Sequence, residues 1–181
     1  MRYPNVMIET PASTLYLLRH AHSNTALPGQ GDHERPLSAR GRDAALAIGP
    51  EIRRAGYAID TVVCSTATRT AETLAAIRPH LPPDTRIESS DALYAHGIEA
   101  YLAAAREHGR ARGLLLIGHN PMIEEFALSL GGSGDREARQ TLAEGFPTAG
   151  LAVLEFATGL ADIGPGTGRL SRLLHPRELG S

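Results

Sequence analysis

Short apolar runs alternate along this chain with longer stretches of helical period, and this alternation limits the possible folds more than any other feature. Turn residues bound the apolar runs, as at residues 61–65 and 114–118. Apolar strands that alternate with amphipathic helices are typical of a mostly parallel sheet covered by helices on both faces. The pattern therefore predicts an α/β fold, a three-layer αβα sandwich around a mostly parallel central sheet.

The expected strands and helices follow from these runs and from the residues that bound them. The strands are expected at residues 14–19, 61–65, 86–89, 114–118 and 151–156, and the helices at residues 39–55, 67–80, 98–108, 120–130 and 136–143. Ser38 and Asn120 are expected as N-caps, with Pro121 in the first helical position. The glycine-rich stretch 131–135 predicts a flexible loop. The tail from Ala157 is expected to add an edge strand or to pack on the sheet.

Length and charge restrict the classes of protein to which the chain can belong. A chain of 181 residues is typical of one globular domain, expected at residues 14–181 after a leader at residues 1–13. With a net charge of −2, nothing draws the whole chain to nucleic acid or to an anionic membrane. A single cysteine, Cys64, and an N-terminus without an apolar signal run indicate a cytoplasmic protein.

Histidines and arginines stand where predicted strands end or where the next helices begin. Arg19 and His20 follow the first strand, Arg69 opens the second helix and His119 follows the fourth strand, while Arg35 lies in the loop 32–38. In open α/β sheets, ligands bind beyond the carboxyl ends of the strands. We therefore expect these side chains to meet at that edge of the sheet.

Two histidines and two arginines that face one another would form a cationic pocket matched to a phosphoryl group. Phosphoryl transfer needs an in-line nucleophile and positive charge on the equatorial oxygens. A neutral imidazole can supply the nucleophile near pH 7. Because the chain has no lysine, every permanent side-chain cation is an arginine, which binds phosphate through two hydrogen bonds.

Three separated motifs resemble the signature of the histidine phosphatase (phosphoglycerate mutase-like) superfamily. They are the RH pair at residues 19–20, STATRTAETL at 65–74 and LLIGHNP at 115–121. The RPLS-x-RG element and the GHNP form are closer to the SixA-like phosphohistidine phosphatase branch than to the mutases. The resemblance runs from about Thr14 to Phe156 and implies a phosphoglycerate mutase-like fold and a phosphatase that needs no metal or other cofactor.

The resemblance also implies a role for each matched residue. His20 would be the phosphorylated nucleophile, Arg19 and Arg69 would bind the phosphoryl oxygens, and His119 would donate to them in the transition state. Arg35 lies in an element that borders the pocket in relatives, and it is carried over as a substrate-binding residue.

The chain departs from the family pattern at two places. Ala21 replaces the glycine that usually follows the nucleophilic histidine, so a positive φ there would be strained. No general acid is recognisable, because Asn120 follows His119, and the acidic or titratable candidates nearby are Asp91, His96 and Glu99. A phosphohistidine expels an imidazole that can already carry a proton, so a missing acid favours P–N over P–O bonds. The expected substrate is a histidine-phosphorylated protein.

Other interpretations remain beside this one. The pocket could hydrolyse small phosphomonoesters, with Asp91, His96 or Glu99 as the acid, or it could belong to a non-catalytic phosphoprotein-binding module. The His20-Ala21-His22 spacing also resembles the metal-binding pair of amidohydrolase barrels, although those barrels need about 250 residues. Cys64 and Arg69 suggest a cysteine phosphatase, but four residues separate them where that class has five.

Overall fold

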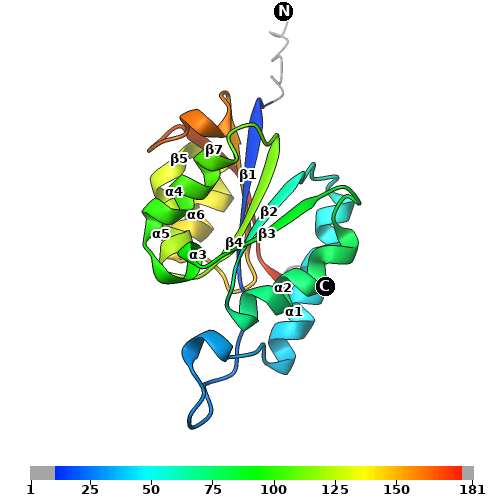
Figure 1. Cartoon of the computed structure of the whole chain (residues 1–181). Coiled ribbons are helices and arrows are strands. Elements are labelled where there is room, and N and C mark those ends of the chain that lie inside the picture. Colours follow the sequence, from blue (N-terminus) through cyan, green and yellow to red (C-terminus); the bar gives the residue numbers. More distant parts are fainter. Residues whose placement is uncertain (1–10, 177–181) are drawn as a thin grey trace, which may run out of the picture.

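A seven-stranded sheet runs through the middle of the molecule, with helices on both of its faces (Figure 1). The computed structural model describes residues 11–176. The strands are β1 (Ser13–Arg19), β2 (Thr61–Ser65), β3 (Arg86–Ser90), β4 (Gly113–Gly118), β5 (Gly131–Gly134), β6 (Leu151–Phe156) and β7 (Gly168–Leu174). The helices are α1 (Ala39–Arg54), α2 (Thr68–Ile77), α3 (Ala92–Ala95), α4 (Ile98–Glu107), α5 (Met122–Leu130) and α6 (Arg136–Glu144), with short 3-10 turns η1 (Asp32–Glu34), η2 (Arg78–His80) and η3 (Leu160–Asp162).

The strand order is β3-β2-β4-β1-β6-β7-β5. Strands β3, β2, β4 and β1 pair in parallel, as do β7 and β5, whereas β6 is antiparallel to both of its neighbours. The predicted three-layer sandwich with a mostly parallel sheet is therefore confirmed. This order places the carboxyl ends of β1, β4 and β2 side by side.

Alternate residues of each strand enter the two halves of the core. Leu15 and Leu17 of β1 pack with residues of α4, α5 and α6, whereas Tyr16 and Leu18 pack on the other face with residues of α1 and α2. Successive side chains of a strand point to opposite faces, so a strand between two helical layers must be apolar at nearly every position. This burial explains why the sequence shows β1 and β4 as continuous apolar runs.

The stretch 131–135 was expected to be a flexible loop, and that expectation is wrong. Residues 131–134 form β5, which pairs in parallel with β7 at the edge of the sheet. A Cβ on Gly132 would overlap the carbonyl oxygen of Gly166, and one on Gly134 would overlap that of Leu170. Glycine is needed here because backbones approach closely, and the same residues give no strand signal in the sequence.

The predicted helix ends are confirmed to within one residue except at the end of α2, where residues 78–80 form the 3-10 turn η2, and at the start of α5. Ser38 caps α1 by accepting a hydrogen bond from the Gly41 amide. The Asn120–Pro121 peptide bond is cis, α5 begins at Met122, and Asn120 is not its N-cap. Instead, the Asn120 side chain donates to Glu124 at 2.8 Å.

The C-terminal tail lies inside the sheet, and β1 follows the N-terminal segment. The tail adds β7, which lies between β6 and β5 rather than at the edge of the sheet. Of the expected leader, residues 1–10 lie outside the described residues, and β1 begins at Ser13. Within residues 11–176, no helix is both long and apolar enough to cross a membrane.

Candidate active site

The predicted site residues gather where β1, β2 and β4 end. Arg19 is the last residue of β1 and His20 follows it, while His119 directly follows β4. Arg69 lies in the first turn of α2, the helix after β2. The rings of His20 and His119 are 5.1 Å apart between centroids, and Arg69 Nε lies 3.3 Å from His20 Nε2. The structure thus brings together three residues that are far apart in the sequence.

Hydrogen bonds define the tautomer of His20. Its Nδ1 lies 2.7 Å from the carbonyl oxygen of Ala21, and a carbonyl can only accept, so Nδ1 carries the proton. Nε2 is then left with its lone pair and faces the Arg69 Nε–H. Ala21 itself is buried, its amide donates to Thr73 Oγ1, and its φ is not positive, so it shows no strain in place of glycine.

Both histidines are held neutral. The pKa of His20 is lowered to about 4, mainly by burial; the hydrogen bond to the Ala21 carbonyl opposes this shift, and the charges of Arg69, Arg19 and Arg35 add to it. Burial also lowers the pKa of His119 to about 3, with smaller contributions from His20 and Arg69. Removal from water disfavours the charged form of an imidazole. Each ring can therefore offer a lone pair at pH 7.

His119 is fixed from two sides. Its Nε2 lies 2.8 Å from Ser65 Oγ, and its backbone amide donates to the Tyr101 hydroxyl at 3.1 Å. That hydroxyl occupies the space next to Gly118, where a Cβ would overlap it. Among the described residues, His119 Nδ1 is buried and has no hydrogen-bond partner. The Ser65 hydroxyl can donate to Nε2 or accept from it, and the ring proton lies on Nδ1 in the tautomer in which Ser65 donates.

Asp32 holds Arg69, and the sequence analysis did not identify it. Arg69 Nη1 donates to the Asp32 carbonyl oxygen at 2.7 Å, and Nη2 donates to Asp32 Oδ2 at 3.0 Å. These two contacts use the end of the guanidinium, so its Nε side faces His20. The Arg35 hydrogen bond and the Arg69 charge outweigh desolvation and lower the pKa of Asp32 to about 2. The carboxylate is therefore ionised throughout the physiological range.

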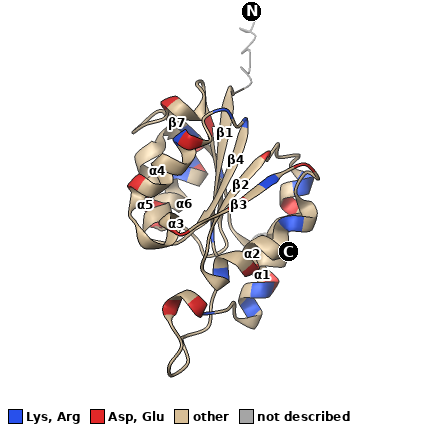
Figure 2. Cartoon of the chain, viewed as in Figure 1, with Lys and Arg blue, Asp and Glu red and all other residues tan. Residues whose placement is uncertain are grey.

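Arg35 braces the loop rather than the pocket. Its guanidinium donates to Asp32 Oδ1 at 2.7 Å, to the Asn24 carbonyl and to Ser23 Oγ. Acidic η1 and the basic start of α1 lie near each other at this end of the molecule (Figure 2). Arg35 thus acts on the pocket through Asp32, which lies between it and Arg69.

Arg19 enters the site from the other side of β1. Its Nη1 donates to the Phe146 carbonyl at 2.7 Å, and its Nε is buried without a hydrogen-bond partner in the described part of the chain. Burial lowers the pKa of Arg19, whereas the charge of Glu124 raises it. Glu124 Oε2 accepts from both Asn120 Nδ2 and the Phe146 amide at 2.8 Å. Glu124 therefore ties the segment that follows His119 to the segment that positions Arg19.

The three acid candidates have different environments. Asp91 Oδ1 accepts a hydrogen bond from Thr66 Oγ1 at 2.6 Å, and the same oxygen of Thr66 lies 3.0 Å from His33 Nε2. His96 and Glu99 are exposed, and neither bonds to His20, Arg69 or His119. Asp91 is thus linked to Tyr94 through Thr66 and His33, whereas His96 and Glu99 have no such link among the described contacts.

The alternative chemistries do not fit this geometry. His22 Nδ1 contacts Ser38 Oγ and its Nε2 contacts Arg40, so it does not pair with His20. Within residues 11–176, no group of three or more His, Cys, Asp or Glu side chains could hold a metal ion. The thiol of Cys64 is buried, and burial raises its pKa to about 12, which leaves it unsuited to act as a nucleophile.

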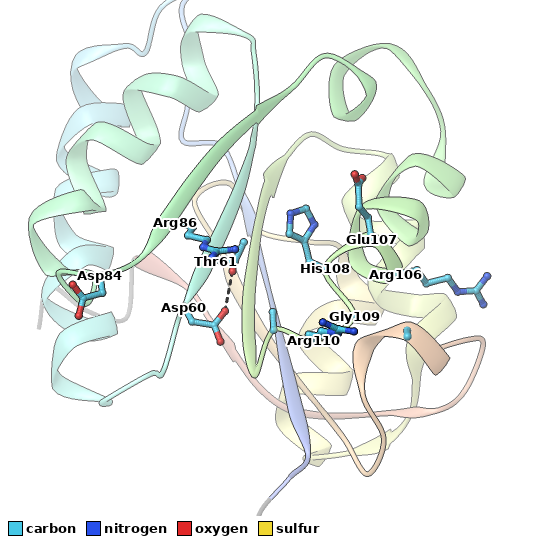
Figure 3. Close-up of a pocket in the computed structure, with 11 residues that line it drawn as sticks. Asp60, Thr61, Asp84, Arg86, Arg106, Glu107, His108, Gly109 and Arg110 are labelled. Carbon is cyan, nitrogen blue, oxygen red and sulfur yellow. Dashed lines mark hydrogen bonds between the residues drawn. The ribbon is translucent and has the colours of Figure 1, made fainter.

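A cavity of about 800 Å³ lies at the opposite end of the sheet (Figure 3). Thr61 and Arg86, at the beginnings of β2 and β3, form one wall of this cavity. The turn after α4, which includes His108 and Arg110, forms another. None of the predicted site residues lines it. Its walls carry both signs of charge, so it shows no preference for a phosphoryl group.

Comparisons with known proteins agree with this geometry. The model of the histidine phosphatase superfamily (branch 1) matches residues 15–93. An uncharacterized protein of Mycobacterium tuberculosis is 37% identical over 161 residues, which cover 86% of this chain and 99% of that protein.

Solved structures extend the similarity over nearly the whole chain. A candidate phosphohistidine phosphatase SixA from Nakamurella multipartitia is 33% identical with a TM-score of 0.79, and the match covers 92% of this chain and 99% of that one. The corresponding candidate SixA from Agrobacterium tumefaciens is 30% identical with a TM-score of 0.77, covering 91% and 99%. The chain therefore belongs to the SixA-like branch of the histidine phosphatase superfamily and is a phosphatase of a class that does not need a metal ion.

Proposed function

We propose that the protein hydrolyses phosphohistidine on other proteins, in the cytoplasm, through a phosphoenzyme formed at His20. The observation that carries this proposal is the state of the His20 ring. Its Nδ1 proton is held by the Ala21 carbonyl, and its Nε2 lone pair faces the Arg69 Nε–H. A fixed lone pair beside a guanidinium suits attack on a phosphorus atom whose oxygens that guanidinium binds.

In the first step, His20 Nε2 attacks phosphorus and the P–N bond of the substrate breaks. The other nitrogen of the substrate imidazole is basic and takes a proton from the solvent before the transfer, so the ring leaves in its neutral form. His20 then carries the phosphoryl group on Nε2 and keeps its proton on Nδ1. No separate acid is needed for this step.

In the second step, water attacks phosphorus and the bond to His20 Nε2 breaks. His20 returns to its neutral form, and the product leaves as dihydrogen phosphate, which retains both protons of the water. The Nε side of Arg69 and the buried Nε of Arg19 would bind the equatorial oxygens. His119 would donate its Nδ1 proton to one of them. Arg35 would act on these oxygens indirectly, because it holds the carboxylate of Asp32 and that carboxylate holds Arg69.

Trapping of the phosphoenzyme tests the role of His20. Quenching without acid should yield an alkali-stable, acid-labile phosphoprotein, and the His20→Ala variant should yield none. His22→Ala serves as the matched control, because this histidine lies two residues away and faces Ser38. Removal of a nucleophile should lower turnover by several powers of ten, so full activity in His20→Ala would refute the assignment.

Hydrolysis of small phosphomonoesters is a second candidate, favoured by one observation. Asp91 is bonded to Thr66, which contacts His33, and an acid there could protonate an alkoxide. A positioned acid contributes about 10²–10⁴-fold. If Asp91 has this role, Asp91→Asn should lower kcat/KM on alkyl monoesters by that factor and leave phosphohistidine unaffected. Equal kcat/KM of the wild type on both substrates would refute the preference for P–N bonds.

A further inference from the structure

Tyr94 of α3 lies beside the buried side chains of Arg69 and His119. Its ring centroid is 5.6 Å from that of His119 and 5.9 Å from Arg69 Cζ. Its hydroxyl donates to Asp32 Oδ2 at 3.1 Å. On the other side, the His33 ring packs against it edge to face, with centroids 4.8 Å apart and an angle of 89°.

Burial shows on which side of the site these rings lie. Arg69 and His119 are 6% and 4% exposed, whereas Tyr94 and His33 are half-buried. The two rings therefore lie on the solvent side of Arg69 and His119. We call Tyr94 and His33 the aromatic wall.

Hydrogen bonds hold the aromatic wall in place at both ends. Tyr94 is tied to Asp32, whose carboxylate is clamped by Arg35 and Arg69. His33 Nε2 contacts Thr66 Oγ1, which in turn donates to Asp91. A ring that is fixed before the substrate binds loses little conformational entropy when it makes a contact.

The leaving group must depart opposite to the attacking atom, because phosphoryl transfer proceeds in line. His20 Nε2 attacks from the buried side, so the leaving group points to the solvent side, where the aromatic wall lies. We propose that the aromatic wall contacts the leaving group and selects a planar aromatic ring, such as the imidazole of phosphohistidine or the ring of an aryl phosphate. The proposal rests on the proposed function in that His20 is taken as the attacking residue.

Kinetics on two matched substrate pairs test this selection. A phosphohistidine peptide and phosphoramidate both contain a P–N bond, but only the peptide has an aromatic ring as its leaving group. Phenyl phosphate and ethyl phosphate form the corresponding P–O pair. Comparison of each variant with the wild type on the same substrate cancels the intrinsic reactivity of that substrate.

Tyr94→Ala should lower kcat/KM about 2- to 10-fold on the two aromatic substrates, which is the range expected for one aromatic contact. On phosphoramidate and ethyl phosphate, it should lower kcat/KM only as far as Tyr94→Phe does, because both variants lose the bond to Asp32. Tyr94→Phe keeps the ring and loses the bond to Asp32, so it should retain the aromatic preference of the wild type. Thermal unfolding of each variant confirms that the fold is intact.

Two results would overturn the proposal. An equal loss on all four substrates in both variants would mean that Tyr94 acts only as an anchor for Asp32. Unchanged kcat/KM for Tyr94→Ala would mean that the ring does not touch the leaving group. If phosphohistidine is not hydrolysed at all, the proposed function fails, and the phenyl and ethyl phosphate pair still decides the role of Tyr94.

Discussion

Acidification is a direct test of the burial of His20. The nucleophile must be neutral to attack, and burial lowers its pKa to about 4 from the ordinary value of 6.5. At pH 5, a group with a pKa of 4 is about 90% neutral, whereas one with a pKa of 6.5 is about 3% neutral. The enzyme should therefore keep nearly all of its reactive form at pH 5, about 30-fold more than an exposed histidine would provide.

The assay is kcat/KM between pH 3.5 and 8, because this parameter reports ionisations of the free enzyme. The ionisation of the substrate phosphate is measured separately by phosphorus NMR and divided out. Asp32, whose pKa is about 2, stays ionised through most of this range. Imidazole nitrogen shifts followed by NMR give the titration of His20 directly and show whether the proton stays on Nδ1.

The stability of the fold should respond in the same pH window. Since the pKa of His20 is lower in the folded than in the unfolded state, the unfolded chain binds more protons between pH 6.5 and 4. Stability is therefore full above about pH 6.5 and falls as the pH drops, by about 3 kcal/mol for this one group. His20→Asn should show a correspondingly smaller loss in denaturant unfolding.

An acid limb near pH 6.5, together with an ordinary histidine titration, would refute this reasoning. It would mean that water reaches the His20 ring in the free enzyme and that burial does not lower the pKa of this residue. A limb near pH 4 in kcat/KM without a matching titration of His20 would assign the limb to another group.

Three further predictions concern the pocket and its support. Arg69→Lys should weaken vanadate binding about 10- to 100-fold in calorimetry, because the bidentate, charge-assisted hydrogen bonds are lost; unchanged affinity would remove Arg69 from the anion site. Exhaustive EDTA treatment should leave kcat/KM unchanged, and activity that is lost and then restored by a divalent metal would contradict the arginine-based mechanism. Gly118→Ala should destabilise the protein by about 1–3 kcal/mol in urea unfolding because the new Cβ overlaps the Tyr101 hydroxyl, whereas Gly164→Ala, with open space around it, should not.

The parts of the site that the sequence predicts are those that follow apolar strands. His20 and His119 each come directly after a continuous apolar run, which the sequence marks as a strand buried on both faces. The position of each histidine at a strand end can therefore be read without knowing the fold. Arg69 is predictable for a similar reason, since it opens the helix that follows β2.

Asp32 and Tyr94 could not be found in this way. Their contacts with Arg69 join a loop and a short helix to a residue 37 and 25 positions away, respectively, and no periodic pattern marks such a distance. The signal available for Asp32 was its place in the same loop as Arg35, three residues before it. Strand β5 was missed for another reason. Its four residues, GGSG, carry no apolar pattern, and they form a strand because β7 supplies a partner backbone.

The strand order also has a consequence for synthesis on the ribosome. The segment matched by the superfamily model, residues 15–93, contains β1, β2 and β3, yet β4 lies between β1 and β2 in the sheet. Until residue 118 has emerged, the apolar β1 has neither of its neighbours, since β6 comes later still. Such non-local pairing delays folding and leaves apolar surface open to chaperones and to aggregation. Since His119 directly follows β4, the nascent chain can join β1 to β2 through β4 and receives its second active-site histidine at almost the same moment.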